Sequence, residues 1–471
     1  MPTFANQSSL WRADRALSQG NYYEASVQRP PAHPPLQGDL RCDVAVVGAG
    51  LAGLSAALEL RARGLQVVLL EAQRIGSGAS GRNGGQAIHG LACEQALIES
   101  QLGLDAARQV WDMSIEALDL LRQRVQQHPI DCEWQDGYLG VATSPAKARA
   151  LWQWAERIEK VYGYSLQILD PAATLAHVAS PRYYGGIRDP RSGHLHPLKY
   201  TLGLAHAAVQ AGVLIHEHTA VTRIDALAGP AGAVVGATGG GSLLRLKTAQ
   251  GTVCAAQVLL AGNVHLPGLA PQFAATLGRR IMPVGTFIAC TEPLRSDLAR
   301  SLIPGREAVC DSNFVLDYFR TTADQRMLYG GRVSYSTLAP SDLKRSMQRR
   351  MIATFAQLRG HAVDYAWGGF VDITMNRAPD FGRVPWQAIT DGQTTGKAGQ
   401  AQVYYLQGFS GHGLSLTGLA GRLVAEAMAG DASRFDVFAR LRHHNFPGGR
   451  SLRTPALVLA MAWYRLRDML G

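Results

Sequence analysis

The chain has 471 residues, of which 47% are hydrophobic and 17% charged. This length predicts two to three domains with cores that need neither disulfides nor a structural metal, and the composition excludes long disorder. The six cysteines are all far apart, which excludes CxxC and zinc-type spacing and predicts reduced thiols in the cytoplasm. Lysine and arginine exceed the acidic residues by 46 − 36 = 10. Such an excess suits nucleic acid, an anionic membrane surface or a polyanionic cofactor.

The N-terminal residues 1–40 are expected to form an extended arm. Prolines are dense between positions 30 and 35, which prevents a helix there and favours extended backbone. Trp11, Tyr22 and Tyr23 predict that the arm packs on the body of the protein. Residues 1–20 lack the basic and apolar regions of a secretory signal, and no stretch reaches the roughly 18 apolar residues of a membrane span.

A strand–glycine–helix–strand pattern follows the arm. Residues 42–47 are apolar except for Asp43, as in a strand buried on both faces of a parallel sheet. The glycine-rich sequence 48–53 comes next, then a predicted helix over 54–63 and a second buried strand over 66–70. Glu71 stands at the end of that strand, 71 − 50 = 21 residues beyond the second glycine.

This spacing predicts a dinucleotide-binding unit. Gly48 permits the tight turn, Gly50 lets the backbone approach a pyrophosphate at the helix N-terminus, and Gly53 allows close packing of helix on strand. Glu71 is placed to accept hydrogen bonds from an adenosine ribose.

A second glycine-rich run, residues 74–86, indicates which dinucleotide binds. Its small residues let the backbone lie against a flat ring system, while Ser80, Arg82 and Asn83 supply donors. With this run the sequence resembles the D-amino-acid-oxidase superfamily of FAD-dependent amine oxidoreductases, and within it the gamma-glutamylputrescine oxidase-like branch. In that family the segment contacts the flavin pyrophosphate and the isoalloxazine ring.

Three further segments carry the resemblance. Residues 258–263 are similar to the motif that returns the chain to the FAD domain, and residues 219–221 to the strand whose valine meets adenine. Residues 408–415 match the C-terminal flavin motif. The resemblance implies FAD as cofactor, held by Gly48, Gly50, Gly53, Glu71, Ala72, Ala79, Ser80, Arg82, Asn83, Gly84, Gly85, Gln86, Val221, Ala261, Gly262, Gly411, His412, Gly413, Leu414 and Ser415.

Two departures from sarcosine-oxidase-type relatives concern the substrate and the cofactor. Those relatives grip the substrate carboxylate with a lysine where this chain has Ser415, and they attach FAD to a cysteine that residues 372–380 lack. We therefore expect non-covalent FAD and an amine substrate rather than an N-methyl glycine.

The expected fold class is α/β, and the expected elements include a helix over 145–162 and a strand over 214–224. An FAD-binding Rossmann-like domain of the glutathione-reductase type is interleaved with an α+β substrate domain, built on an antiparallel sheet that includes strands near 286–289, 314–319 and 327–329. The expected boundaries are 41–95, 190–267 and 370–440 for the FAD domain, 96–189 and 268–369 for the substrate domain, and 441–471 for a C-terminal tail with an apolar helix.

The resemblance implies oxidation of an amine C–N bond by hydride transfer to flavin N5, giving an imine that water hydrolyses to aldehyde and ammonia. His412 and the helix start beside it are expected to stabilise negative charge on the reduced flavin. Tyr318 and Arg320 share one face at period 2, so Tyr318 is expected to wall the flavin and Arg320 to bind a distal carboxylate. His89 and Trp367 are further candidates for the substrate pocket.

The sequence leaves the electron acceptor open between oxygen and a quinone. The apolar segment 455–464, flanked by arginines, either docks on the protein or lies in a membrane interface, so a peripheral place on the inner membrane face stays an alternative to the cytoplasm. A membrane-associated imino acid or amino acid dehydrogenase, acting on a pipecolate- or proline-like substrate, is the main alternative function. An RNA-modifying flavoprotein is disfavoured, because the densest basic run, 344–350, contains no stacking aromatic. We therefore expect no nucleic-acid partner and no metal.

Overall fold

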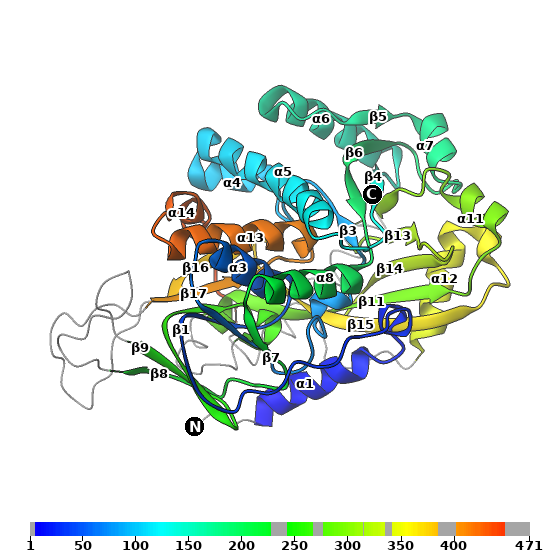
Figure 1. Cartoon of the computed structure of the whole chain (residues 1–471). Coiled ribbons are helices and arrows are strands. Elements are labelled where there is room, and N and C mark those ends of the chain that lie inside the picture. The colour runs from blue at the N-terminus through cyan, green and yellow to red at the C-terminus, as the bar shows by residue number, and fades with distance from the viewer. Residues whose placement is uncertain are drawn as a thin grey trace.

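The computed structural model describes residues 5–227, 243–266, 277–313, 315–334, 342–384 and 402–447 (Figure 1). The predicted apolar C-terminal helix and most of the glycine-rich stretch 226–241 lie outside these residues.

The first sheet is built around parallel strands in the order β17-β10-β1-β2-β7. Its central strands are buried, as their continuous apolar sequence predicts. Antiparallel β16 flanks β17, while β9 pairs with β10 and β8 with β9. The bounds are β1 Gly38–Val47, β2 Val67–Leu70, β7 Leu214–His216, β8 Arg223–Leu227, β9 Leu243–Lys247, β10 Gly251–Leu260, β16 Asp380–Val384 and β17 Gln402–Gln407.

Helices α3 (Leu51–Ala62) and α13 (Gly413–Met428) pack closely against each other beside this sheet (Figure 1). A Cβ at Gly421 of α13 would lie 2.6 Å from the backbone nitrogen of Ala56, so small residues set the distance between the helices. Helix α8 (Pro197–Gln210) also packs on α3, and α5 (Leu104–Gln127) packs on α13.

The second sheet has the order β15-β11-β14-β13-β12-β4-β6-β3, with β5 beside β6. Its neighbours are antiparallel except for the parallel pair β12 and β4. The bounds are β3 Gln86–Ala87, β4 Gln135–Val141, β5 Gln167–Leu169, β6 Gly186–His194, β11 Ile281–Thr291, β12 Ala308–Asp311, β13 Tyr318–Thr321, β14 Met327–Ser334 and β15 Val363–Thr374. The expected strand 314–319 therefore begins at Tyr318, and Phe314 lies outside the described residues.

Short helices complete the molecule. Helix α6 has the predicted bounds: Ser144 caps its N-terminus by accepting from the backbone of Lys147, and proline occupies its first position. Further helices among the described residues are α4 Gln95–Leu102, α6 Pro145–Tyr162, α7 Pro171–His177, α11 Ser296–Leu302, α12 Leu343–Thr354 and α14 Ser433–Ala439, with 3-10 turns η1 Ala79–Gly81, η2 Asn263–His265 and η3 Ala356–Leu358. No helix among the described residues is long and apolar enough to cross a bilayer.

The structure corrects two expectations about local structure. The N-terminal arm is not extended throughout, because α1 (Ala5–Leu17) and α2 (Tyr22–Ala25) are helices. The prolines come after these helices, and Leu17 packs in the core of the second sheet. The single strand expected over 214–224 is two strands, β7 and β8, since the chain turns where buried Glu217 accepts from backbone N–H groups.

Candidate active site

A cavity of about 760 Å³ is lined by residues from both sheets. The ends of β1 and β2, the start of α3 and the segment 76–86 form one part of its wall. Strands β11, β13, β14 and β15 of the second sheet form another. The start of α13 also lines it, so segments far apart in the sequence meet at one site.

The first glycine-rich turn leaves no space for side chains. Gly48 has a φ of +110°, and a Cβ there would lie 2.6 Å from the carbonyl oxygen of Ala261. A Cβ at Gly53 would lie 2.0 Å from the carbonyl oxygen of Gly48, so α3 contacts the turn directly. The backbone N–H of Leu51 donates to Ser80 Oγ at 2.9 Å, which joins the two glycine-rich segments at the start of α3.

Glu71 lies at the end of β2 with its carboxylate partly buried in the cavity wall. Its oxygens accept from the backbone nitrogens of Ala49 at 2.7 Å and Gln73 at 2.9 Å. Burial raises the pKa of Glu71, and these N–H groups oppose the rise. Each carboxylate oxygen has a further lone pair that can accept a hydrogen bond from a hydroxyl group.

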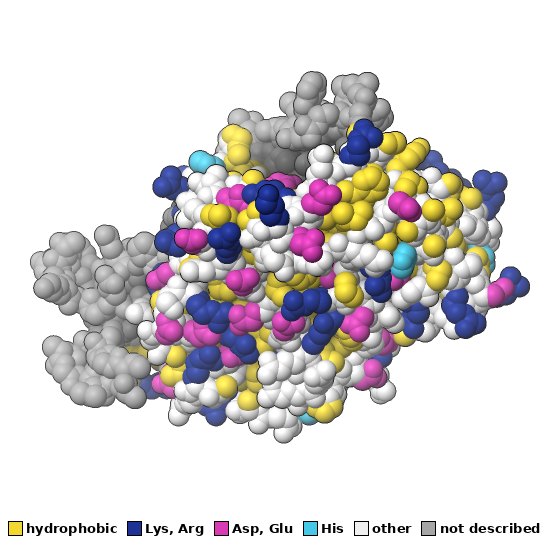
Figure 2. All heavy atoms as spheres, turned by 90° about the horizontal axis from the view of Figure 1, so that it is seen from above, with side chains coloured by type: hydrophobic (Ala, Val, Ile, Leu, Met, Phe, Trp, Pro, Cys, Tyr) yellow, Lys and Arg dark blue, Asp and Glu magenta, His cyan; other side chains and the backbone are white. Residues whose placement is uncertain are grey.

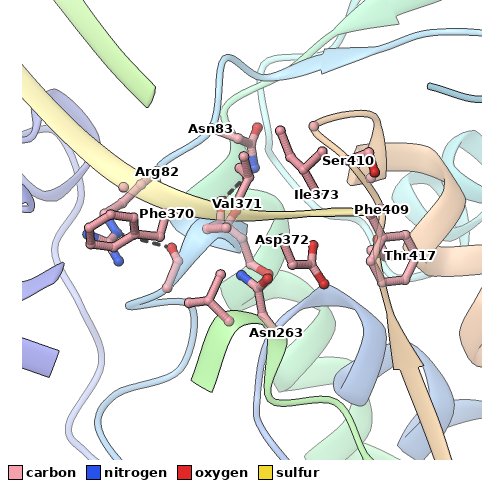
Figure 3. Close-up of a pocket in the computed structure, with 18 of the residues that line it drawn as sticks. Arg82, Asn83, Asn263, Phe370, Val371, Asp372, Ile373, Phe409, Ser410 and Thr417 are labelled. Atoms are coloured by element: carbon pink, nitrogen blue, oxygen red, sulfur yellow. Dashed lines mark hydrogen bonds between the residues drawn. The ribbon is translucent and has the colours of Figure 1, made fainter. Parts of the chain in front are cut away.

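The second glycine-rich segment is held in shape by its own side chains (Figure 3). The Asn83 amide donates to the carbonyls of Ala79 and Ser80 and accepts from the Gly85 nitrogen at 2.8 Å. The Arg82 guanidinium bonds to the Asp14 carboxylate at 2.7 Å and to backbone carbonyls. Both side chains line the cavity, but these bonds use their donors to fix the loop.

His412 precedes the first turn of α13 and lines the cavity. Its Nε2 lies 3.2 Å from the Ile88 carbonyl and 3.0 Å from the His89 carbonyl, so this nitrogen must carry the proton and donate. Burial, with the neighbouring His89, lowers the pKa of His412 to about 4. The imidazole is therefore neutral at pH 7, and the N-terminus of α13 contributes positive character at this end of the cavity.

Tyr318 lines the cavity from β13, as its predicted role requires. A Cβ at Gly84 would lie 2.5 Å from the ring and one at Gly330 would lie 2.0 Å from it, so the ring fills the space between two glycines. Burial raises the pKa of Tyr318, so its phenol stays protonated.

Arg320 shares the Tyr318 face of β13 but does not line the cavity. Its guanidinium donates to the carbonyls of Gly84 at 2.9 Å and Leu195 at 3.0 Å, and to the Tyr23 hydroxyl at 3.1 Å. This buried cation holds the loop that reaches the cavity, which is a positioning role, and the expected binding of a substrate carboxylate stays a prediction.

His89 and Trp367 also lie behind the cavity wall rather than in it. His89 pairs with Asp189 at 2.7 Å, and the Trp367 indole donates to the Arg82 carbonyl at 2.9 Å. Both are buried and support segments whose other residues reach the cavity.

Most predicted cofactor residues meet at this cavity. Of the described residues, Gly53, Gly85 and Ser415 lie just outside its lining. Those that line it are Gly48, Gly50, Glu71, Ala72, Ala79, Ser80, Arg82, Asn83, Gly84, Gln86, Val221, Ala261, Gly262, Gly411, His412, Gly413 and Leu414.

Apart from Tyr318, sequence reasoning missed the side chains that the second sheet contributes to the cavity. Met282, Val284 and Thr286 line the cavity from alternate positions of β11, a pattern that period-2 analysis of that strand can find. Asp372 of β15 lines it too and accepts from the Gly408 nitrogen at 2.6 Å. Burial raises the pKa of Asp372 to about 7. No local motif singled out this carboxyl.

The cavity fits a dinucleotide carrying a flavin. Two helix N-termini, α3 and α13, face it, and they suit anionic groups such as a pyrophosphate. Asn263, at the rim of the Gly48 turn, has a buried Oδ1 without a partner among the described residues (Figure 3). Buried polar atoms are normally hydrogen-bonded, so this acceptor fits a ligand rich in hydroxyl and N–H donors.

Comparison with known proteins gives the class. The model of the family described as FAD dependent oxidoreductase matches residues 43–427, and the chain belongs to this family. This confirms the predicted superfamily, the α/β fold and FAD as the cofactor. Residues at both ends of the cavity would hold it, with Glu71 and Val221 at the adenosine end and Gly84 and the start of α13 at the flavin end.

Individual relatives match nearly the whole chain. Gamma-glutamylputrescine oxidoreductase of Escherichia coli (strain K12) is 42% identical over 451 residues, covering 96% of this chain and 98% of the relative. The probable oxidoreductase OrdL of Haemophilus influenzae is 37% identical, covering 95% of this chain and 97% of its own. Glycine oxidase from Geobacillus kaustophilus superposes with a TM-score of 0.64 at 20% identity, over 83% of this chain and 95% of that one, which shows the shared fold.

Proposed function

We propose that the protein oxidises the C–N bond of a primary or secondary amine, with gamma-glutamylputrescine or a close relative as substrate. The full-length similarity to gamma-glutamylputrescine oxidoreductase supports this substrate class. The observation that carries the proposal is that the second-sheet wall, although it includes Asp372, holds no cation. Among the described residues that line the cavity, strands β11 to β15 contribute no lysine or arginine, and Arg377, which lines the cavity just after β15, is exposed.

This wall favours an amine over a small α-amino acid. A carboxylate beside the reacting carbon needs a buried cation, and a charge left unpaired in such a wall is costly. Met282, Val284 and Val333 instead suit the methylene chain of an aliphatic amine. Ser415, which replaces the carboxylate-gripping lysine of sarcosine-oxidase-type relatives, does not line the cavity.

Bound FAD supplies a two-electron acceptor for the hydride that leaves the carbon next to nitrogen. The amine must be neutral so that its lone pair assists this departure, and the nitrogen then gives up one proton. The resulting imine and one water give aldehyde and ammonia when the amine is primary. The chain contributes orientation, with Tyr318 filling the space against Gly84, and the N-terminus of α13 favours negative charge on the reduced cofactor.

The cysteine of the cavity wall bears on how FAD is held. Cys310 lines the cavity, donates to Gln86 Oε1 at 2.9 Å, and burial raises the pKa of its thiol. A thiol kept protonated is a poor nucleophile, which supports the proposed non-covalent binding of FAD.

The surface supports a small-molecule substrate rather than RNA. On the face in Figure 2, lysine and arginine lie among aspartate and glutamate instead of forming one continuous basic stripe. The electron acceptor is proposed to be oxygen, with a quinone as the alternative that the following experiment tests.

The test mixes purified, flavin-loaded protein with gamma-glutamylputrescine without air and follows the flavin absorbance. We expect bleaching within seconds and return of the colour when air is admitted. Bleaching without rapid return of the colour would support the amine as substrate and indicate a quinone, rather than oxygen, as the electron acceptor. Absence of bleaching would contradict the proposed substrate, and bleaching by proline or pipecolate alone would favour an imino acid dehydrogenase.

A further inference from the structure

The N-terminal helix α1 takes part in the cofactor cavity, although it lies outside every flavin motif. Trp11 and Asp14 of this helix line the cavity. The helix packs beside β15 of the second sheet, about 350 residues further along the chain (Figure 1). It therefore contributes a part of the cavity wall that comes from neither sheet.

Two contacts attach α1 to cofactor segments. The Asp14 carboxylate binds the Arg82 guanidinium of the second glycine-rich segment through Oδ2 at 2.7 Å, and this pair is buried. The Trp11 ring stacks on His265 with a centroid distance of 3.7 Å and an interplanar angle of 11°. His265 ends the turn η2 that follows Ala261 and Gly262 of the FAD-domain motif.

The ion pairs of Asp14 use only one of its two carboxylate oxygens, Oδ2. Its residue is 6% exposed, and Oδ1 has no hydrogen-bond partner among the described residues. Burial opposes ionisation of Asp14, but hydrogen bonds with His265 and Arg82 and the charge of Arg82 outweigh it and lower the pKa. A buried carboxylate oxygen that lines a ligand cavity and lacks a donor needs one from the ligand.

We propose that Asp14 is a cofactor ligand, whose Oδ1 accepts a hydrogen bond from a ribityl hydroxyl of FAD, so that α1 closes the cavity over the bound cofactor. We expect Glu71 to bind the hydroxyls of the adenosine ribose, whereas Asp14 pairs with Arg82 of the second glycine-rich segment, for which the family resemblance implies contact with the flavin. The ribityl chain carries the remaining hydroxyl donors. Carboxylates form stronger hydrogen bonds than neutral acceptors, so the contact contributes to affinity.

The test compares FAD with ADP, which has the adenosine and pyrophosphate groups but no ribityl chain or flavin. Apoprotein of the wild type, Asp14→Ala and the matched control Arg15→Ala, an exposed residue on the same helix, is titrated with each ligand. We expect Asp14→Ala to weaken FAD binding about tenfold or more while ADP binding changes less than about twofold. The control should change neither affinity.

Three outcomes would overturn the proposal. These are an unchanged FAD affinity in Asp14→Ala, equal losses of FAD and ADP affinity, or a loss of the same size in Arg15→Ala. An equal loss for both ligands would mean that Asp14 only supports the fold through Arg82.

A second measurement needs no variant and covers the case in which Asp14→Ala fails to fold. Hydrogen exchange of the backbone amides of α1 is followed in the wild-type apoprotein, alone and with saturating FAD or ADP. We expect FAD to slow exchange of α1 at least several-fold and ADP to leave it unchanged. The same exchange with all three would contradict closure of α1 over the cofactor.

Discussion

The cavity wall built on the first sheet and the wall built on the second sheet recognise a ligand with different parts of the chain. The first presents backbone: the turn at Gly48 and the N-termini of α3 and α13. The second presents side chains, among them Met282 and Tyr318. Backbone recognition depends on glycines at fixed spacing and leaves a local motif, whereas side-chain recognition draws on residues that only the folded sheet brings together.

The largest effect is expected on the backbone wall, at Gly53. In Gly53→Ala the new Cβ would lie 2.0 Å from the Gly48 carbonyl oxygen, and neither backbone can yield without moving α3 from the turn. We expect FAD affinity to fall by about 100-fold or more, measured by titrating apoprotein and following flavin fluorescence.

Gly78→Ala is the matched control, because Gly78 lines the same cavity and a Cβ there meets nothing within 4 Å. It should bind FAD within about twofold of the wild type. Equal behaviour of the two variants would mean that close packing of α3 does not govern cofactor binding.

Arg320 of β13 joins the two walls, because its guanidinium donates to the Gly84 carbonyl of the second glycine-rich segment. Arg320→Leu removes donors from the carbonyls of Gly84 and Leu195 and leaves these buried acceptors unpaired. We expect the free energy of unfolding to fall by about 2–3 kcal/mol and the flavin content of the purified protein to drop. Denaturant unfolding and the flavin absorbance of the same samples measure both.

A different pattern would restore the carboxylate-binding role predicted from the sequence. In that case Arg320→Leu would keep its stability and flavin, and KM would rise for substrates with a distal carboxylate but not for putrescine.

A substitution of Tyr318 changes only the cavity wall that is built on the second sheet. Tyr318→Ala opens a gap beside Gly84 and Gly330, so the substrate loses its orientation while the backbone contacts to FAD remain. We expect kcat/KM to fall about tenfold and FAD affinity to stay within about threefold of the wild type. Tyr318→Phe keeps the ring and should retain most of kcat/KM. If the phenylalanine variant loses as much as the alanine variant, the hydroxyl takes part in the reaction.

The smallest effect is a dependence of stability on pH that comes from Asp372. Burial, helped by the charge of Asp380, raises its pKa from 3.8 to about 7 in the folded protein. The folded state therefore holds this proton more tightly than the unfolded state, and the group costs stability as pH rises from about 4 through 7. In Asp372→Asn the side chain is neutral throughout, so the Tm of the variant relative to wild-type apoprotein should rise by a few degrees between pH 5 and pH 8.

Thermal unfolding of both apoproteins across this pH range checks the sign. A constant difference in Tm would mean that Asp372 titrates as an ordinary exposed carboxyl. A difference that shrinks with rising pH would reverse the assignment, because it would require a lowered pKa.

Prediction from the sequence was most accurate where structure is local. The bounds of α6 follow from Ser144, Pro145 and the apolar spacing, and the strand–turn–helix around Gly48 follows from glycine spacing. The segment 1–40 shows where this fails. Its prolines lie outside helices, as predicted. Helix α1 forms before them because its apolar face packs on the core of the second sheet.

The sequence by itself determined the family, the cofactor and the cavity-lining glycines, because backbone recognition of a dinucleotide requires particular residues at particular spacing. The tertiary structure decided which polar side chains reach that cavity. Period 2 placed Arg320 on the same face as Tyr318, but segments around Gly84 and Leu195 cover its guanidinium. Asp14, from a helix without any motif, does reach the cavity. Whether a side chain on a given face reaches the cavity depends on which distant segments cover that face. The spacing of residues in a single strand or helix gives no information about those segments.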